Sequence, residues 1–115
     1  MELEPINISE KFNLFDEFWS PKIIAEMNDY QFKIAKIKGE FVWHKHSQTD
    51  ETFLVIKGEM QLHLRGKIIH LKTGEMIVVP CGVEHMPRAL EECHILMIER
   101  AGTINTGSRG GDRTV

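Results

Sequence analysis

The sequence has few cysteines, no excess of basic charge and no long apolar run. Cys81 and Cys93 are too few for a disulfide framework and lack zinc-ribbon spacing. Lys and Arg total 14 against 17 Asp and Glu, so the net charge of −3 offers no basic surface for nucleic acid. No run approaches the roughly 20 apolar residues of a membrane span. These absences argue against nucleic-acid and membrane partners.

We also expect no export signal. The first residues, Met1-Glu2-Leu3-Glu4-Pro5, are acidic where a signal peptide is basic, and no apolar core follows them. Because a disulfide framework is missing as well, we expect the protein in the reducing cytoplasm.

The chain has the length and the composition of one globular domain. It has 115 residues, of which 42% are hydrophobic and 27% are charged. We expect three segments: a lead-in with a short helix over 1–21, a β-barrel over 22–100 and an irregular tail over 101–115. The turn sequence Asn105-Thr106-Gly107 favours an ordered tail.

The expected helix has Ser9 as its N-cap, and Pro21 ends it. Its apolar face consists of Phe12, Phe15 and Trp19, spaced as i, i+3 and i+7.

Residues 22–100 show short alternating strands with glycine between them. Asn28-Asp29 supplies the first turn. Strands at this spacing, with almost no helix, indicate an all-β sandwich or closed barrel. The expected strands are 22–26, 31–38, 41–46, 52–57, 60–64, 67–71, 76–79 and 94–99.

Three histidines and one glutamate form a candidate metal site. His44 and His46 are two apart on an expected strand, so their imidazoles share a face and can converge on one ion. Glu51 opens the next strand, and a hairpin would return its carboxylate to that interior. Pro80-Cys81-Gly82 fixes the backbone just before His85. Such donors suit one divalent ion of Fe, Mn, Ni, Zn, Co or Cu.

Each of these residues also has a simpler interpretation. A His-x-His sequence on a strand often lies on the protein surface without binding a metal. Taken alone, Glu51 is an ordinary hairpin residue, and His85 is an ordinary histidine of a turn. Cys81 more often fills a turn than contacts a substrate. The remaining histidines are assigned to strand faces without a catalytic role: His63, His70 and His94.

The joint spacing decides between these interpretations, because it resembles the first signature motif of the cupin superfamily. Gly39 precedes His44-Lys45-His46, four residues separate His46 from Glu51, and six more lead to Gly58. The family has five residues between the first glycine and the first histidine, whereas this chain has four.

The second cupin motif is matched as well. Gly74 is followed by five residues, Pro80-Cys81-Gly82, two residues and His85. Ala89 stands where the family has asparagine, a residue that is not a metal ligand there. The resemblance implies a double-stranded β-helix, the cupin jelly-roll barrel, with a short N-terminal helix. It also implies that one metal is held by the four ligand positions His44, His46, Glu51 and His85.

More narrowly, the chain resembles small bacterial single-domain cupins. It shares with them Trp19-Ser20-Pro21-Lys22-Ile23, the segment 39–46 and Asn105-Thr106-Gly107. Such proteins often carry the label mannose-6-phosphate isomerase-like, which is an analogy of fold. Only residues 59–73 lie between the two motifs, about enough for one hairpin, so we expect no inserted lid.

The resemblance leaves two functions open. One is a mononuclear metalloenzyme, a dioxygenase or isomerase, acting on a small organic molecule; its catalytic residues are not identified. The other is a module that binds a sugar or another small molecule without turnover. Cupins commonly dimerise, and we expect a homodimer. The outward-facing residues pack under the N-terminal strands or form its interface: Phe41, Trp43, Leu54 and Ile56.

Overall fold

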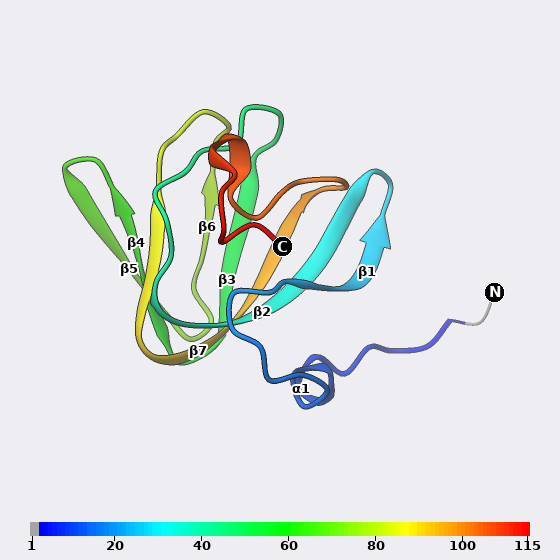
Figure 1. The fold of residues 1–115 in the computed structure, drawn as a ribbon. Coiled ribbons are helices and arrows are strands. Elements are labelled where there is room, and N and C mark those ends of the chain that lie inside the picture. The colour runs from blue at the N-terminus through cyan, green and yellow to red at the C-terminus, as the bar shows by residue number, and fades with distance from the viewer. Residues whose placement is uncertain (1–2) are drawn as a thin grey trace.

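Strands make up about half of residues 3–115, the part of the chain that the computed structural model describes. No helix within that part is long and apolar enough to cross a membrane. The all-β architecture with one short N-terminal helix is therefore confirmed (Figure 1). The elements are α1 (Ile8–Phe12), β1 (Lys22–Met27), β2 (Tyr30–Glu40), β3 (Glu51–Lys57), β4 (Glu59–Leu64), β5 (Lys67–Lys72), β6 (Met76–Val79), β7 (Met86–Arg100) and the 3-10 turn η1 (Gly107–Arg109).

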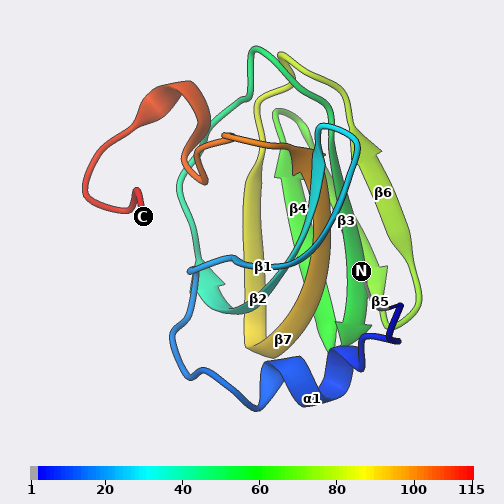
Figure 2. The same ribbon diagram turned by 90° about the vertical axis from the view of Figure 1, so that its right-hand side faces the viewer.

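Strand β7 organises the sheet. The strand order is β1-β2-β7-β3-β6, and β4 pairs with both β5 and β7. β7 thus pairs antiparallel with β2, β3 and β4 as it curves across the molecule (Figure 2). Only 94–99 was predicted as a strand here, because the glutamates at the centre of β7 interrupt its apolar alternation.

The strand alternation places the core on one side of the sheet. On β3, Glu51, Phe53 and Val55 are buried while the residues between them are less so. Glu51 therefore lies at the end of an inward-facing apolar row. The buried core consists of Ala35, Ile37, Phe53, Val55, Met60, Leu62, Leu71, Val79, Ala89, Cys93, Ile95 and Met97.

The outer face of β2, β3 and β7 is covered by α1. Phe12 packs there against Ile34 and Leu96, and Leu54 and Ile56 pack around this second cluster. The chain's own N-terminal segment therefore covers these two predicted outward-facing residues.

The other two predicted outward-facing residues are also engaged. Phe41 is buried and stacks on Trp19 with ring centroids 4.9 Å apart. The Arg65 guanidinium lies over the Trp43 ring, with its central carbon 3.8 Å from the ring centroid. All four residues therefore contact other parts of the described chain, which favours packing within the chain, and the homodimer stays a prediction.

The helix prediction was wrong in its start and its length. The Asn7 side chain accepts a hydrogen bond from the Glu10 N–H at 3.0 Å, so Asn7 and not Ser9 is the N-cap. The helix stops at Phe12 and does not reach Pro21.

Beyond the helix, contacts with β2 replace further helical turns. The Lys36 ammonium donates to the Phe15 carbonyl at 2.7 Å, and the Trp19 N–H donates to the Lys36 carbonyl at 2.9 Å. Trp19 adopts a φ of 59°, a left-handed conformation that is uncommon for residues other than glycine. The predicted helical face through Phe15 and Trp19 therefore does not form.

The C-terminal tail, residues 101–115, lies against the segment 41–46 (Figures 1 and 2). The Ser108 N–H donates to the Lys45 carbonyl at 3.0 Å, and Gly107 packs against that same carbonyl. Thr106 is fully buried, and its hydroxyl hydrogen-bonds to that of Thr114. The tail thus follows a defined path along the segment that carries two of the candidate ligands.

Candidate metal centre

Segment 41–46 is irregular, so the predicted strand there was wrong. It pairs with the segment around His85 through an isolated bridge between His44 and His85, flanked by backbone hydrogen bonds from the Phe41 N–H to the Pro87 carbonyl and from the Gly82 N–H to the His46 carbonyl. The His44 N–H donates to the His85 carbonyl at 3.0 Å, and the His85 N–H donates to the His44 carbonyl at 2.8 Å. This reciprocal pair holds together the two segments that supply the histidines.

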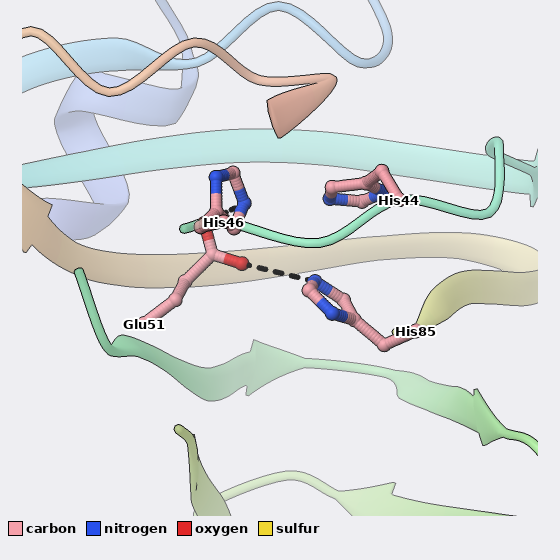
Figure 3. A group of neighbouring side chains, drawn as sticks. All are labelled: His44, His46, Glu51 and His85. Atoms are coloured by element: carbon pink, nitrogen blue, oxygen red, sulfur yellow. Dashed lines mark ion pairs between the residues drawn. The ribbon is translucent and has the colours of Figure 1, made fainter. Parts of the chain in front are cut away.

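The structure brings all four predicted residues into one cluster. His44, His46, Glu51 and His85 are each no more than 5% exposed. One donor atom from each lies within 4.8 Å of the others. Figure 3 shows the imidazoles and the Glu51 carboxylate directed toward a common centre.

Backbone carbonyls orient two of the imidazoles. The Nδ1 atom of His44 lies 2.9 Å from the Val42 carbonyl, and that of His85 lies 2.9 Å from the Val83 carbonyl. A carbonyl only accepts, so each Nδ1 carries the proton and each Nε2 keeps its lone pair. The same arrangement orients histidine ligands in metal sites.

Three of the donor atoms at the centre have no hydrogen-bond partner. Glu51 Oε2 lies 3.4 Å from His46 Nε2, and Oε1 lies 3.3 Å from His85 Nε2. Within residues 3–115, His46 Nε2, His85 Nε2 and Glu51 Oε1 are buried without a hydrogen bond. Unsatisfied buried polar atoms cost about 1–3 kcal/mol each, so their convergence fits a cation at this position.

Burial and neighbouring groups keep His44 and Glu51 in their ligating protonation states. Burial lowers the pKa of His44 to about 4, with a further lowering by His85. Burial alone would raise the pKa of Glu51, but the neighbouring side chains of Glu99, His46 and His85 hold it well below its usual range. At neutral pH the cluster therefore offers a neutral His44 and an ionised Glu51.

Sequence reasoning missed two charged residues behind the cluster. Glu99 is 1% exposed, and its carboxyl accepts from the Lys33 ammonium at 2.8 Å. Burial and the adjacent Glu51 carboxylate raise the pKa of Glu99, and the Lys33 ammonium opposes that rise. Strand parity was the available signal, because Glu99 continues the inward row of Ile95 and Met97 on β7.

The metal-free protein is expected to lose stability as the pH falls from about 6.5 to about 4. In this window unfolded His44 binds a proton that the folded protein does not, because its pKa is lowered from 6.5 to about 4. Its contribution to stability is present above pH 6.5 and lost as the pH falls through 4, about 3 kcal/mol in total. Urea unfolding of chelator-treated wild type and His44→Gln checks this; equal pH dependence in both would contradict it.

The remaining histidines and both cysteines lie outside the cluster. His63 Nε2 is 2.9 Å from the Gln61 carboxamide, and His94 Nε2 is 2.7 Å from the Glu92 carboxylate. His70 is exposed. Cys81 is also exposed, and Cys93 is buried in the core.

A small cavity borders the cluster. Its volume is about 30 Å³, and it reaches His44 and Glu51. Aromatic and aliphatic side chains form most of its wall, which consists of Trp19, Pro21, Ala35, Ile37, Phe41, Phe53, Pro87, Ile95, Met97 and Asn105.

Comparisons with known proteins agree with this architecture. A cupin-2 domain-containing protein of Shewanella frigidimarina is 57% identical, with a TM-score of 0.82 over 83% of this chain and 93% of that one. Protein NMB1881 of Neisseria meningitidis is 32% identical, with a TM-score of 0.78 over 85% of this chain and all of that one. The uncharacterized protein YdbB of Bacillus subtilis is 32% identical over 77 residues, 66% of this chain and 68% of YdbB.

The family model for the cupin domain, Cupin_2, matches residues 32–99, more than half of the chain. That stretch runs from β2 to β7 and contains both histidine segments and Glu51. The expected double-stranded β-helix is confirmed by the strands and by these relatives. This chain belongs to the cupin family.

Proposed function

We propose that this cupin binds one divalent transition metal through His44, His46, Glu51 and His85. The observation that carries the proposal is the convergence of buried donor atoms that lack hydrogen bonds, two imidazole nitrogens and one carboxylate oxygen. Three imidazoles and one carboxylate suit Fe, Mn, Co, Ni, Cu or Zn.

We further propose that the bound metal serves chemistry on a small organic molecule, of the oxygenase or isomerase type. When bound, such a metal supplies Lewis-acid polarisation of a substrate oxygen, or redox chemistry if it is redox-active. The chain holds the imidazoles of His44 and His85 by their Nδ1–H groups. The apolar wall around His44 and Glu51 excludes water from the reacting groups.

One observation favours the alternative, a small-molecule or sugar-binding module without turnover. Among the residues that line the cavity, the ionisable ones are His44 and Glu51, and both are proposed ligands. The cavity wall therefore supplies no separate acid or base.

A turnover assay distinguishes the two functions. We expect the metal-loaded protein to convert more than one equivalent of at least one compound from a panel of hydroxylated aromatics, 2-oxo acids and hexose phosphates, followed by NMR. His46→Ala should abolish the conversion. His63→Ala is the matched control, because His63 is a partly exposed strand histidine bonded to Gln61, and it should retain activity. Stoichiometric binding without product would instead support the binding module.

The cytoplasmic location and the homodimer stay predictions. Support for a dimer now comes from a different surface, the end strand β6, where Met76 and Val78 are more than half exposed. Exposed apolar side chains on an edge strand are a common site of pairing between chains.

A further inference from the structure

The mouth of the small cavity is built from three separate parts of the chain. Trp19 comes from the N-terminal segment, Phe41 follows β2, and Asn105 belongs to the C-terminal tail. The rings of Trp19 and Phe41 stack with an interplanar angle of 17°. Phe41 in turn meets His44 edge-on, with centroids 5.5 Å apart. An aromatic wall therefore leads from the surface to a proposed ligand.

Trp19 is held in this position at a conformational cost. Its φ of 59° lies in the left-handed region, which is unfavourable for an L-residue. Two hydrogen bonds to β2 maintain it: its N–H donates to Lys36 and its indole Nε1–H to the Lys38 carbonyl at 3.0 Å. Strain of this kind concentrates at functional sites, which supports a role for the indole face.

A cation lies over the aromatic pair. The Arg113 guanidinium is 5.0 Å from the Phe41 ring centroid and 5.9 Å from that of Trp19. It also donates to the Glu40 carbonyl at 3.4 Å. In the described part of the chain, Arg113 forms no ion pair with a carboxylate. Its charge is therefore available to an anion bound at the mouth.

The Asn105 side chain must move before an organic molecule can enter this small cavity. The cavity of about 30 Å³ has room for about one water molecule. Asn105 forms two hydrogen bonds within the tail. Its Nδ2 donates to the Arg113 carbonyl at 2.9 Å, and its Oδ1 accepts from the Val115 N–H at 3.1 Å. Displacing the Asn105 side chain would enlarge the mouth, and neither of these bonds involves the Arg113 guanidinium.

We propose that Trp19, Phe41 and Arg113 select a small planar carboxylate as the ligand of the proposed metal centre. This inference rests on the proposed function, because the ligand would lie beside His44 and Glu51. The aromatic pair offers a flat apolar surface, and the arginine offers planar bidentate hydrogen bonding to a carboxylate.

Benzoate titration tests the proposal on the full chain, with and without Zn²⁺. In a Trp43→Phe background Trp19 is the single tryptophan, so its fluorescence reports binding at the mouth. We expect saturable quenching by benzoate and about tenfold weaker binding of both benzamide and cyclohexanecarboxylate. Arg113→Gln should weaken benzoate binding about tenfold and Arg113→Lys less, because lysine keeps the charge but not the planar geometry.

Arg109→Gln is the matched control, since Arg109 is an exposed arginine of the same tail, and it should bind benzoate like wild type. No saturable quenching, or equal benzoate affinity in Arg113→Gln and wild type, would overturn the proposal. Equal affinity of the wild type for benzoate and benzamide would also overturn the proposal. Zn²⁺ content, measured separately by elemental analysis, shows whether the metal centre itself fails.

Discussion

His85→Ala is expected to lower the affinity for Zn²⁺ by at least about 100-fold. Loss of a group that merely orients a ligand costs 10- to 100-fold in affinity, and His85 is proposed as a ligand itself. Its Nε2 is one of the buried atoms without a hydrogen bond, and it lies 3.3 Å from Glu51 Oε1. Equilibrium dialysis of chelator-stripped protein against Zn²⁺ measures the effect.

Two further variants separate metal binding from folding. His85→Gln keeps a polar side chain of similar volume, so it should fold like wild type and still lose most of the affinity. His63→Ala removes a histidine outside the cluster and should leave Zn²⁺ affinity unchanged. If folded His85→Gln bound Zn²⁺ as tightly as wild type, His85 would not be a ligand.

Gly107→Ala is expected to release the C-terminal tail from segment 41–46. A Cβ at this position would overlap the Lys45 carbonyl oxygen, and backbone cannot give way as a flexible side chain can. We expect trypsin to cleave after Arg109 and Arg113 at least tenfold faster than in wild type, because cleavage follows the population of the opened form. The melting temperature should change little, since the tail lies outside the core cluster. Timed digestion with mass spectrometry measures the effect.

Gly110→Ala is the matched control for this release. Gly110 has a φ of 64° and a ψ of −154°, a conformation essentially confined to glycine, so alanine meets backbone strain there as it does at Gly107, whose φ is 59°. A Cβ at Gly110 has no atom of the described chain within 4 Å. Equal acceleration of cleavage in the two variants would show that strain, not the contact with Lys45, controls the tail.

The candidate site could be predicted from the sequence because its information is local. The spacing of His44, His46 and Glu51 and the turn before His85 are short-range patterns. They lead to the right cluster even though 41–46 is not a strand, because the reciprocal hydrogen bonds of His44 and His85 replace the missing ladder.

What could not be predicted depends on contacts between distant residues. The helix ends early because Lys36 of β2 forms hydrogen bonds with the backbone of Phe15 and Trp19. β7 extends back to Met86 because three strands supply its hydrogen-bond partners despite exposed glutamates. The ion pair of Lys33 with Glu99 joins residues 66 positions apart. Local propensity carries no signal for such long-range pairings.

The most direct test of the metal centre is the metal content of the wild-type protein, purified without an affinity tag and measured by elemental analysis. If the four residues form a metal site, we expect close to one equivalent of a single transition metal per chain, either as purified or after reconstitution of stripped protein. Its identity would also separate redox-active from redox-inert chemistry. A negligible metal content that stays negligible after reconstitution would contradict the proposed metal centre.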